Sequence, residues 1–422
     1  MREYLERLIE TTISDTMRSV GCVVIEGPKW CGKSTTGQRF AKSVIELAKP
    51  NIYRQYKIFS DLGDPNLLKG EKPLMFDEWQ KIPDLWDYIR ADIDENGLRG
   101  QYILTGSTKP QEDEKRHSGT GRIIKIVMRP MSLWESRESN GQVSLRELFD
   151  EPDYIAGENN HKLSDIAFLL CRGGWPQSVL EKEKDIALMA ARNYISTLIE
   201  QDINEVDGKK KNPARARAIL RAYARNLSTS AKLSTIKNDI EVNDTALDPR
   251  TLDSYINSFR NLYVIEDIEA WSPKLRSKSV LRTTNTRQLI DPSLATAALD
   301  ASPEDIISDI KTFGFLFESL CIRDLRIYAQ SLGGSVYNYR DSSGLETDAI
   351  IHLKDGKWGA IEVKIGGEDS IELAAKHLIE LKDKVDTEKM NQPSFLMVLT
   401  ASRYAYRRSD GIYVVPIGCL KN

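Results

Sequence analysis

The N-terminal third of the chain alternates short apolar runs with amphipathic, charged stretches. Residues 2–19 carry apolar side chains at helical spacing and predict an entry helix. The run Cys22–Glu26 predicts a strand, and a helix is expected over Lys33–Ala48. Two further apolar runs, Leu74–Glu78 and Gln101–Leu104, predict strands, while the charged stretch before the first of them is expected to be irregular. The pattern indicates an α/β core.

The middle of the chain predicts helices followed by extended segments. Helices are expected over Pro213–Leu227, Ser230–Asp239 and Pro249–Leu262, with Ser228 and Asp248 as helix starts. The segments YVIEDIEAW and TRQLID then read as two strands. Three helices and a two-stranded wing make a winged helix-turn-helix the natural interpretation of residues 206–300.

The last third of the chain predicts both helices and strands. An apolar helix is expected first, followed by three strands in a meander, a second helix and two final strands. These elements are Phe313–Leu325, Ser335–Arg340, Leu345–Leu353, Trp358–Lys364, Ile371–Val385, Phe395–Thr400 and Ile412–Ile417. Residues 301–422 therefore predict a second α/β core.

Composition narrows the class of protein. The 422 residues, 41% of them hydrophobic, are enough for several domains with real cores. Lysine and arginine total 59 against 62 acidic residues, a net charge of −3, so any basic surface is local. Five cysteines without a C-x-x-C pair and only four histidines indicate neither a zinc site nor a disulfide framework, which fits a reducing cytosol. No apolar run approaches a membrane span, and no membrane partner is expected.

The sequence GPKWCGKST after the first strand fits the phosphate-binding pattern G-x-x-x-x-G-K-[ST]. Glycines at both ends let backbone N–H groups turn toward phosphate oxygens, and the following helix adds its positive end. Lys33 is expected to reach the β and γ phosphates of ATP, and Ser34 to bind Mg²⁺. The predicted nucleotide-binding residues are Gly27, Pro28, Lys29, Trp30, Cys31, Gly32, Lys33, Ser34 and Thr35.

Two later strands end in candidate catalytic groups. Asp77 closes an apolar strand, where it would join the Mg²⁺ shell, and Glu78 follows, where it would polarise the attacking water. Thr105 and Ser107 follow the next strand and are candidates to contact the γ phosphate or that water, although a plain turn is an equal alternative. Cys31, beside a helix N-terminus and Lys33, is expected to be a reactive thiol that ATP protects.

The C-terminal region carries a second constellation, Asp348 followed by Glu362-Val363-Lys364, in the pattern D-x13-E-x-K. Pairing Asp348 opposite Glu362 leaves a three-residue hairpin loop that ends in Gly356, as a type I turn with a bulge requires. Asp348, Glu362 and a partner in the first turn of the preceding helix, Glu318, would bind Mg²⁺ while Lys364 orients or deprotonates water. The region resembles PD-(D/E)XK nucleases, although Thr347 stands where the strict motif has proline.

The N-terminal motifs together carry a more specific resemblance. GPKWCGKSTT, LMFDEWQKIPDLWDYIR, YILTGST and GRIIKIVMRPMSLWES resemble the prokaryotic predicted ATPases of the AAA+ superfamily that carry a C-terminal domain of unknown function, and GGWPQSVL extends the likeness. The resemblance implies an AAA+-like P-loop ATPase core over residues 1–136 and a helical lid or connector over residues 137–205. Arg122, after the third strand, is interpreted as a solvated loop arginine, with action on its own or on a neighbouring chain's nucleotide as the alternative.

Local charge supplies the partner hypothesis. Residues 207–260 hold eleven basic against six acidic residues, and residues 270–290 hold five basic residues and no acid. Arg250 would reach a DNA groove and Lys274, Arg276, Lys278 and Arg282 would meet phosphates. The sequence thus predicts a cytoplasmic, Mg²⁺-dependent ATPase acting on or near DNA. The alternative is a nucleotide-gated regulatory or scaffold protein with an inactive nuclease-like domain, as a homo-oligomer or with a protein partner.

Overall fold

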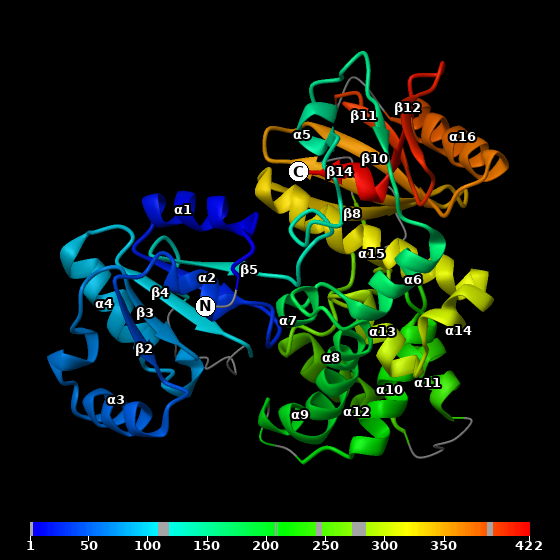
Figure 1. Cartoon of the computed structure of the whole chain (residues 1–422). Coiled ribbons are helices and arrows are strands. Elements are labelled where there is room, and N and C mark those ends of the chain that lie inside the picture. The colour runs from blue at the N-terminus through cyan, green and yellow to red at the C-terminus, as the bar shows by residue number, and fades with distance from the viewer. Residues whose placement is uncertain are drawn as a thin grey trace.

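The chain folds into three parts (Figure 1). One cluster of buried apolar side chains extends through all three, and the N-terminal and C-terminal parts each have a further cluster of their own. The computed structural model describes residues 3–108, 118–206, 208, 210–241, 247–271, 284–385 and 391–422. The N-terminal part (residues 3–136) is a parallel sheet with flanking helices. The helical part (residues 163–308) contains no paired strand among its described residues except isolated bridges, and the C-terminal part (residues 310–422) is built on a mixed sheet.

The N-terminal sheet has the strand order β2-β3-β4-β1-β5, with every pair parallel. Its strands are β1 (Cys22–Glu26), β2 (Ser43–Glu46), β3 (Leu74–Asp77), β4 (Tyr102–Gly106) and β5 (Ile123–Val127). Strand β4 lies between β1 and β3, and parallel strands bring their carboxyl ends to one edge. The side chains that follow β1, β3 and β4 therefore meet.

The helices of this part depart from the sequence prediction in three places. Helix α2 (Lys33–Gln38) ends after six residues, and the predicted helix to Ala48 is wrong because Val44 and Ile45 lie on the β-branched strand β2. The stretch expected to be irregular contains α3 (Pro50–Leu62), which begins at a proline and ends at Gly63 in the left-handed conformation. Helix α1 (Ile9–Ser19) begins later than predicted, and α4 (Leu85–Asn96) completes the set.

The described residues of the helical part form ten short helical elements. They are α6 (Leu163–Arg172), α7 (Pro176–Val179), α8 (Lys184–Thr197), the π-helical turn η3 (Leu198–Asp202), α9 (Ile203–Glu205), α10 (Pro213–Arg225), α11 (Leu233–Glu241), α12 (Pro249–Asn261), α13 (Pro292–Leu299) and α14 (Pro303–Ser308). Helix α13 contacts α6, α8 and α10. The predicted division at residue 205 is therefore not a boundary in the packing.

The three predicted helices of the middle region are present as α10, α11 and α12, with one wrong start, and α13 is a fourth helix that was not expected. Asp248 caps α12 through its side chain, as expected. Ser228 does not begin α11, because its backbone is left-handed (φ 57°) and its hydroxyl donates to the Phe315 carbonyl oxygen of another helix. Antiparallel bridges join Ile265 to Leu289 and Ile268 to Thr286, where a wing was expected. The wing residues Lys274, Arg276, Lys278 and Arg282 lie outside the described residues.

The C-terminal sheet has seven strands in the order β7-β12-β13-β11-β10-β9-β8. Six come from this part: β8 (Gly334–Arg340), β9 (Glu346–Leu353), β10 (Trp358–Lys364), β11 (Phe395–Thr400), β12 (Tyr404–Arg407) and β13 (Tyr413–Pro416). Helix α15 (Ile310–Ser331) contacts β8, β9 and β10, and α16 (Glu368–Lys384) contacts β9, β10 and β11. The predicted α/β core is therefore present in this part.

A segment expected to be helical pairs instead with strands of the C-terminal part, one in the seven-stranded sheet and one in a separate two-stranded sheet. Strand β7 (Gly157–Glu158) pairs with β12, and β6 (Val143–Ser144) pairs with β14 (Leu420–Lys421), while α5 (Leu145–Leu148) lies between them. The helical connector predicted for residues 137–205 is therefore wrong in its first third. The C-terminal part needs this earlier segment to complete its sheet.

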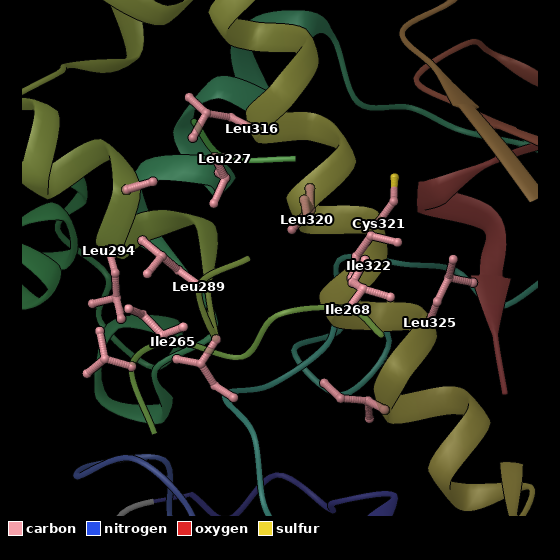
Figure 2. Close-up of a cluster of buried hydrophobic side chains, with 14 of the residues drawn as sticks. Leu227, Ile265, Ile268, Leu289, Leu294, Leu316, Leu320, Cys321, Ile322 and Leu325 are labelled. Carbon is pink, nitrogen blue, oxygen red and sulfur yellow. The ribbon is translucent and has the colours of Figure 1, made fainter. Parts of the chain in front are cut away.

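Helix α15 is the central element between the helical and C-terminal parts. Figure 2 shows its side chains Leu316, Leu320 and Ile322 within the cluster that also contains Leu227, Leu289 and Leu294 of the helical part. Almost every residue from Phe313 to Ala329 is buried. The two parts therefore share a core and cannot separate without exposing it.

The GGWP sequence joins the helical part to the N-terminal part. The Met131 N–H donates to the Gly174 carbonyl oxygen at 2.6 Å. A Cβ atom at Gly174 would lie 2.1 Å from the Met131 oxygen, so only glycine fits this contact. Trp175 is buried, stacks on Tyr194 and donates its indole N–H to Ser293 at 3.0 Å. This loop is a rigid contact between two parts.

We expect Gly174→Ala to lower the free energy of unfolding by about 1–3 kcal/mol, because the added methyl group overlaps the Met131 backbone. Gly314→Ala is the matched control. Its Cβ atom would meet no atom closer than 3.8 Å inside α15, where alanine favours the helix. Urea unfolding of both variants checks this, and equal stability of Gly174→Ala and the wild type would contradict the close contact.

Candidate functional site

The loop between β1 and α2 is held in an unusual backbone conformation. Gly27 has φ 152° and a Cβ atom there would lie 2.1 Å from the Met128 oxygen, while Gly32 has φ 104° at the start of α2. Trp30 is left-handed (φ 65°) although it is not glycine. Backbone strain of this kind persists where the surroundings fix it, and it is frequent in ligand-binding loops.

Lys33, Ser34 and Asp77 come together at the carboxyl edge of the sheet. The buried Lys33 ammonium donates to the Pro28 carbonyl oxygen at 2.6 Å, which keeps it within the loop. The Ser34 hydroxyl donates to Asp77 Oδ1 at 2.7 Å, and Thr105 donates to the same oxygen from the neighbouring strand at 2.5 Å. A hydroxyl and a carboxylate are ligands that Mg²⁺ prefers, so these residues fit the ion.

Glu78 follows β3 in a strained position. Its backbone is left-handed (φ 57°), and its carboxylate accepts hydrogen bonds from Ser107 at 3.1 Å and from the Gln80 amide. Thr105 and Ser107 are both buried. The predicted catalytic candidates at the ends of β3 and β4 therefore lie together; they are Asp77, Glu78, Thr105 and Ser107. Gln80, which orients Glu78, is not among the predicted residues.

A cavity of about 480 Å³ opens beside this cluster. Its wall includes most of the phosphate loop and Glu78, together with residues from outside the N-terminal sheet. The loop residues that line it are Lys29, Trp30, Gly32, Lys33, Ser34 and Thr35. Tyr4, Leu5, Pro176 and Leu180 supply a second wall, which joins the N-terminal segment to the helical part.

Two basic side chains beside the loop make specific contacts with other segments. Lys29 donates to Asp202 Oδ1 at 2.6 Å, at the end of the π-helical turn η3. Arg7 lies buried against the loop and donates to the Cys31 carbonyl oxygen at 2.8 Å. Sequence reasoning missed Arg7 and Asp202, because no local pattern connects them to the motif.

The expectation of a reactive Cys31 is wrong, while Arg122 has the position of a solvated arginine, with its side chain 49% exposed. The Cys31 side chain is fully buried with its Sγ atom 3.4 Å from the Met128 oxygen, so it is not an accessible, reactive thiol. Arg122 precedes β5 and its carbonyl oxygen accepts from Cys22 N–H at the start of β1, which is the opposite edge of the sheet from the loop. Arg122 pairs with Asp94 at 2.6 Å and cannot reach the nucleotide of its own chain.

The hairpin register predicted for the C-terminal part is confirmed. Ile361 pairs with Ala349, so Glu362 lies opposite Asp348, and Leu353 N–H donates to the Lys357 oxygen across the loop. Gly356 has the left-handed φ of 87°. Helix α15 begins three residues before Phe313, so Glu318 is not in its first turn, but Glu318 and Asp348 line one cavity of about 250 Å³.

Charges are concentrated in this cluster. The Lys364 ammonium lies 2.7 Å from Glu362 Oε2 and 3.7 Å from Asp348 Oδ2. Burial, and then the Asp348 charge, raise the pKa of Glu362 to about 8 and that of Glu318 well above its usual range. Burial opposes the charge on Lys364, but the Asp348 and Glu362 carboxylates outweigh it and raise its pKa.

The metal site predicted from Asp348, Glu362 and Glu318 is not assembled in the form expected. Across the described residues, no three or more His, Cys, Asp and Glu side chains converge as a set of metal ligands. One observation still fits a cation: Glu362 Oε1 is buried without a hydrogen-bond partner. In this structure Lys364 supplies the positive charge between the two carboxylates.

Comparison with known proteins identifies domains along the chain. Residues 20–136 match a family described as "AAA domain". Residues 163–305 and 313–420 match two families described as "Domain of unknown function", DUF8612 and DUF4143. The first match supports an AAA-type ATPase domain that binds ATP. No described helix has both the length and the apolar character to cross a membrane.

The relatives and the solved structures that resemble this chain share little sequence identity with it. The chain is 21% identical over 401 residues to "Uncharacterized protein Rv2008c" of Mycobacterium tuberculosis and to "Uncharacterized protein Mb2031c" of Mycobacterium bovis, covering 93% of this chain and 79% of each relative. The Walker-type ATPase paby2304 of Pyrococcus abyssi is 15% identical (70% of this chain, 96% of that one, TM-score 0.42). AMPPCP-bound DnaA of Aquifex aeolicus is 15% identical (60% and 87%, TM-score 0.29). Both TM-scores are too low to carry an argument about this chain.

The burial of the thiols leads to a direct test. All five cysteines are buried, so we expect a water-soluble disulfide reagent to modify none of them quickly in the native protein and all of them in urea. Adding ATP should not change the rate at which the thiols of the native protein react. One rapidly reacting thiol that ATP protects would contradict the buried position of Cys31.

Proposed function

We propose that the protein is a Mg²⁺-dependent ATPase whose site lies at the carboxyl edge of the N-terminal sheet. The observation that carries the proposal is the hydrogen-bonded cluster of Ser34, Asp77 and Thr105 beside Lys33. Hydroxyl and carboxylate oxygens suited to Mg²⁺ and an ammonium suited to phosphate occur together there. Mg²⁺, when bound, would neutralise the charge that develops on the phosphates.

Each residue has a distinct proposed task. Lys33 would exchange its bond to the Pro28 oxygen for phosphate oxygens, and Ser34 and Asp77 would hold Mg²⁺. Glu78 would accept a proton from the attacking water, in an orientation fixed by Ser107 and Gln80. The Thr105 hydroxyl would stay on Asp77 and keep its carboxylate oriented.

The second wall of the cavity suggests where the base lies. Leu5, Pro176 and Leu180 are apolar, and the Tyr4 hydroxyl lies 3.0 Å from Thr36 Oγ1, which fixes the aromatic ring. The flat aromatic face of an uncharged base fits such a wall better than a charged group. The nucleotide would therefore contact both the N-terminal segment and the helical part.

A second candidate function is action on DNA by the C-terminal part. The Asp348, Glu362 and Lys364 side chains lie together with the register that the nuclease-like pattern requires. Arg250 is exposed at the start of α12, where a DNA contact was expected. The alternative is a nucleotide-gated regulatory or scaffold protein in which this cluster cuts nothing, and ATP turnover that DNA does not change would favour it.

We expect Lys33→Ala to weaken ATP binding by about tenfold or more, because it removes a cation that contacts the ground-state phosphates. Glu78→Gln should keep binding but lower kcat by about 10²–10⁴, because the amide cannot take the proton of the water. Glu95→Gln, on the exposed face of α4, is the matched control. Nucleotide titration and steady-state turnover check these effects, and wild-type turnover in Glu78→Gln would remove Glu78 from the mechanism.

The C-terminal cluster is tested in the full chain, because β6, β7 and the core around α15 make residues 301–422 dependent on the rest. Without nucleotide, we expect Mn²⁺ to raise the melting temperature by a few degrees, since the ion relieves repulsion between Asp348 and Glu362. Asp348→Asn should abolish the shift, while Asp383→Asn, exposed on α16, should keep it. An equal shift in both variants would exclude this cluster as a cation site.

A further inference from the structure

Arg7 makes contacts that connect the N-terminal segment to the phosphate loop. It precedes the region matched by the AAA family, and its side chain is 4% exposed. The guanidinium donates from Nη1 to the Cys31 oxygen at 2.8 Å, from Nη2 to the Arg129 oxygen at 2.7 Å, and from Nε to Glu135 at 3.1 Å. Three acceptors, one in the phosphate loop and two in the segment after β5, fix one planar group.

The partner carboxylate is itself fixed. Glu135 Oε1 also accepts from Leu8 N–H at 2.8 Å, and Oε2 accepts from Ser132 N–H at 2.8 Å. The Glu135 side chain is 1% exposed, so the ion pair is screened from water. Arg7 therefore cannot adopt another position without leaving a buried carboxylate unpaired.

The contact with the Cys31 oxygen has a consequence for phosphate binding. A trans peptide group is planar, so its C=O and the N–H of the next residue point to opposite sides. With the Cys31 oxygen held toward Arg7, the Gly32 N–H points away from Arg7. Gly32 has φ 104° and no Cβ atom, so little else in its own geometry fixes this plane.

We propose that Arg7 is a positioning residue that orients the Cys31–Gly32 peptide so that the Gly32 N–H binds a phosphate oxygen of the nucleotide. This inference rests on the proposed ATP site and adds a residue outside the AAA domain to it. Arg7 lines the same cavity as Lys33, so its charge also favours an anionic ligand there. The N-terminal segment is then part of the nucleotide site.

The test compares Arg7→Lys with the wild type and with Arg137→Asn. Lysine keeps a positive charge beside Glu135 but cannot reach three acceptors at once. Arg137 ties the same two segments through an exposed pair with Glu3 at 2.8 Å, and asparagine tolerates its left-handed backbone (φ 63°). The melting temperature of each protein is measured first. Kd for ATP and ADP, kcat and KM are then measured at a temperature well below the lowest melting temperature.

We expect Arg7→Lys to raise Kd and KM about tenfold or more while kcat changes much less, because a charge-assisted hydrogen bond orders the loop before the chemistry. Arg137→Asn should bind as the wild type does. If folded Arg7→Lys binds ATP with wild-type Kd, Arg7 is only a structural arginine and the inference is wrong. If Arg7→Lys does not fold, Glu135→Gln, which loosens the same guanidinium, must raise Kd, and unchanged Kd there overturns the inference. A wild type that binds no nucleotide would instead refute the proposed function.

Discussion

A buried ion-pair network around Arg323 holds the three parts together. Arg323 of α15 bonds Asp291 at 2.9 Å and Asp324 at 2.7 Å, all three side chains being at most 2% exposed. Asp324 accepts a hydrogen bond from the N–H of Leu133, in the segment after β5. Asp291 accepts one from the N–H of Gly174, in the GGWP loop. Loss of any partner would leave a charge buried and unpaired, so the three parts keep one relative arrangement.

This arrangement gives the cavity beside the phosphate loop its walls. The GGWP loop places Pro176 beside the phosphate loop, and the segment after β5 carries Glu135, which holds Arg7. Helix α15 reaches from the same network to the sheet that carries Glu362. The two charged clusters are therefore connected through one packed core, and any effect of one on the other would pass through packed side chains.

The sequence predicted those features whose residues lie close together in the chain at a fixed spacing. The phosphate loop, Asp77, Glu78 and the hairpin of Asp348 and Glu362 could all be found, because their spacing is set by turns and strand register. Other features depend on distant residues. Arg7 meets Glu135 across 128 positions, and Cys31 is buried by the Met128 backbone, so no local signal exists for either. Strand β2 was mistaken for helix because its apolar residues are too few to distinguish the two periods.

In the proposed site, one nucleotide contacts the N-terminal segment, the phosphate loop and the helical part together. Hydrogen exchange of the full chain with and without Mg²⁺ and ATP measures these contacts. We expect slower exchange in residues 3–8, 27–36 and 177–180 at the same nucleotide concentration. Protection confined to residues 27–36, or absent from all three segments, would contradict it.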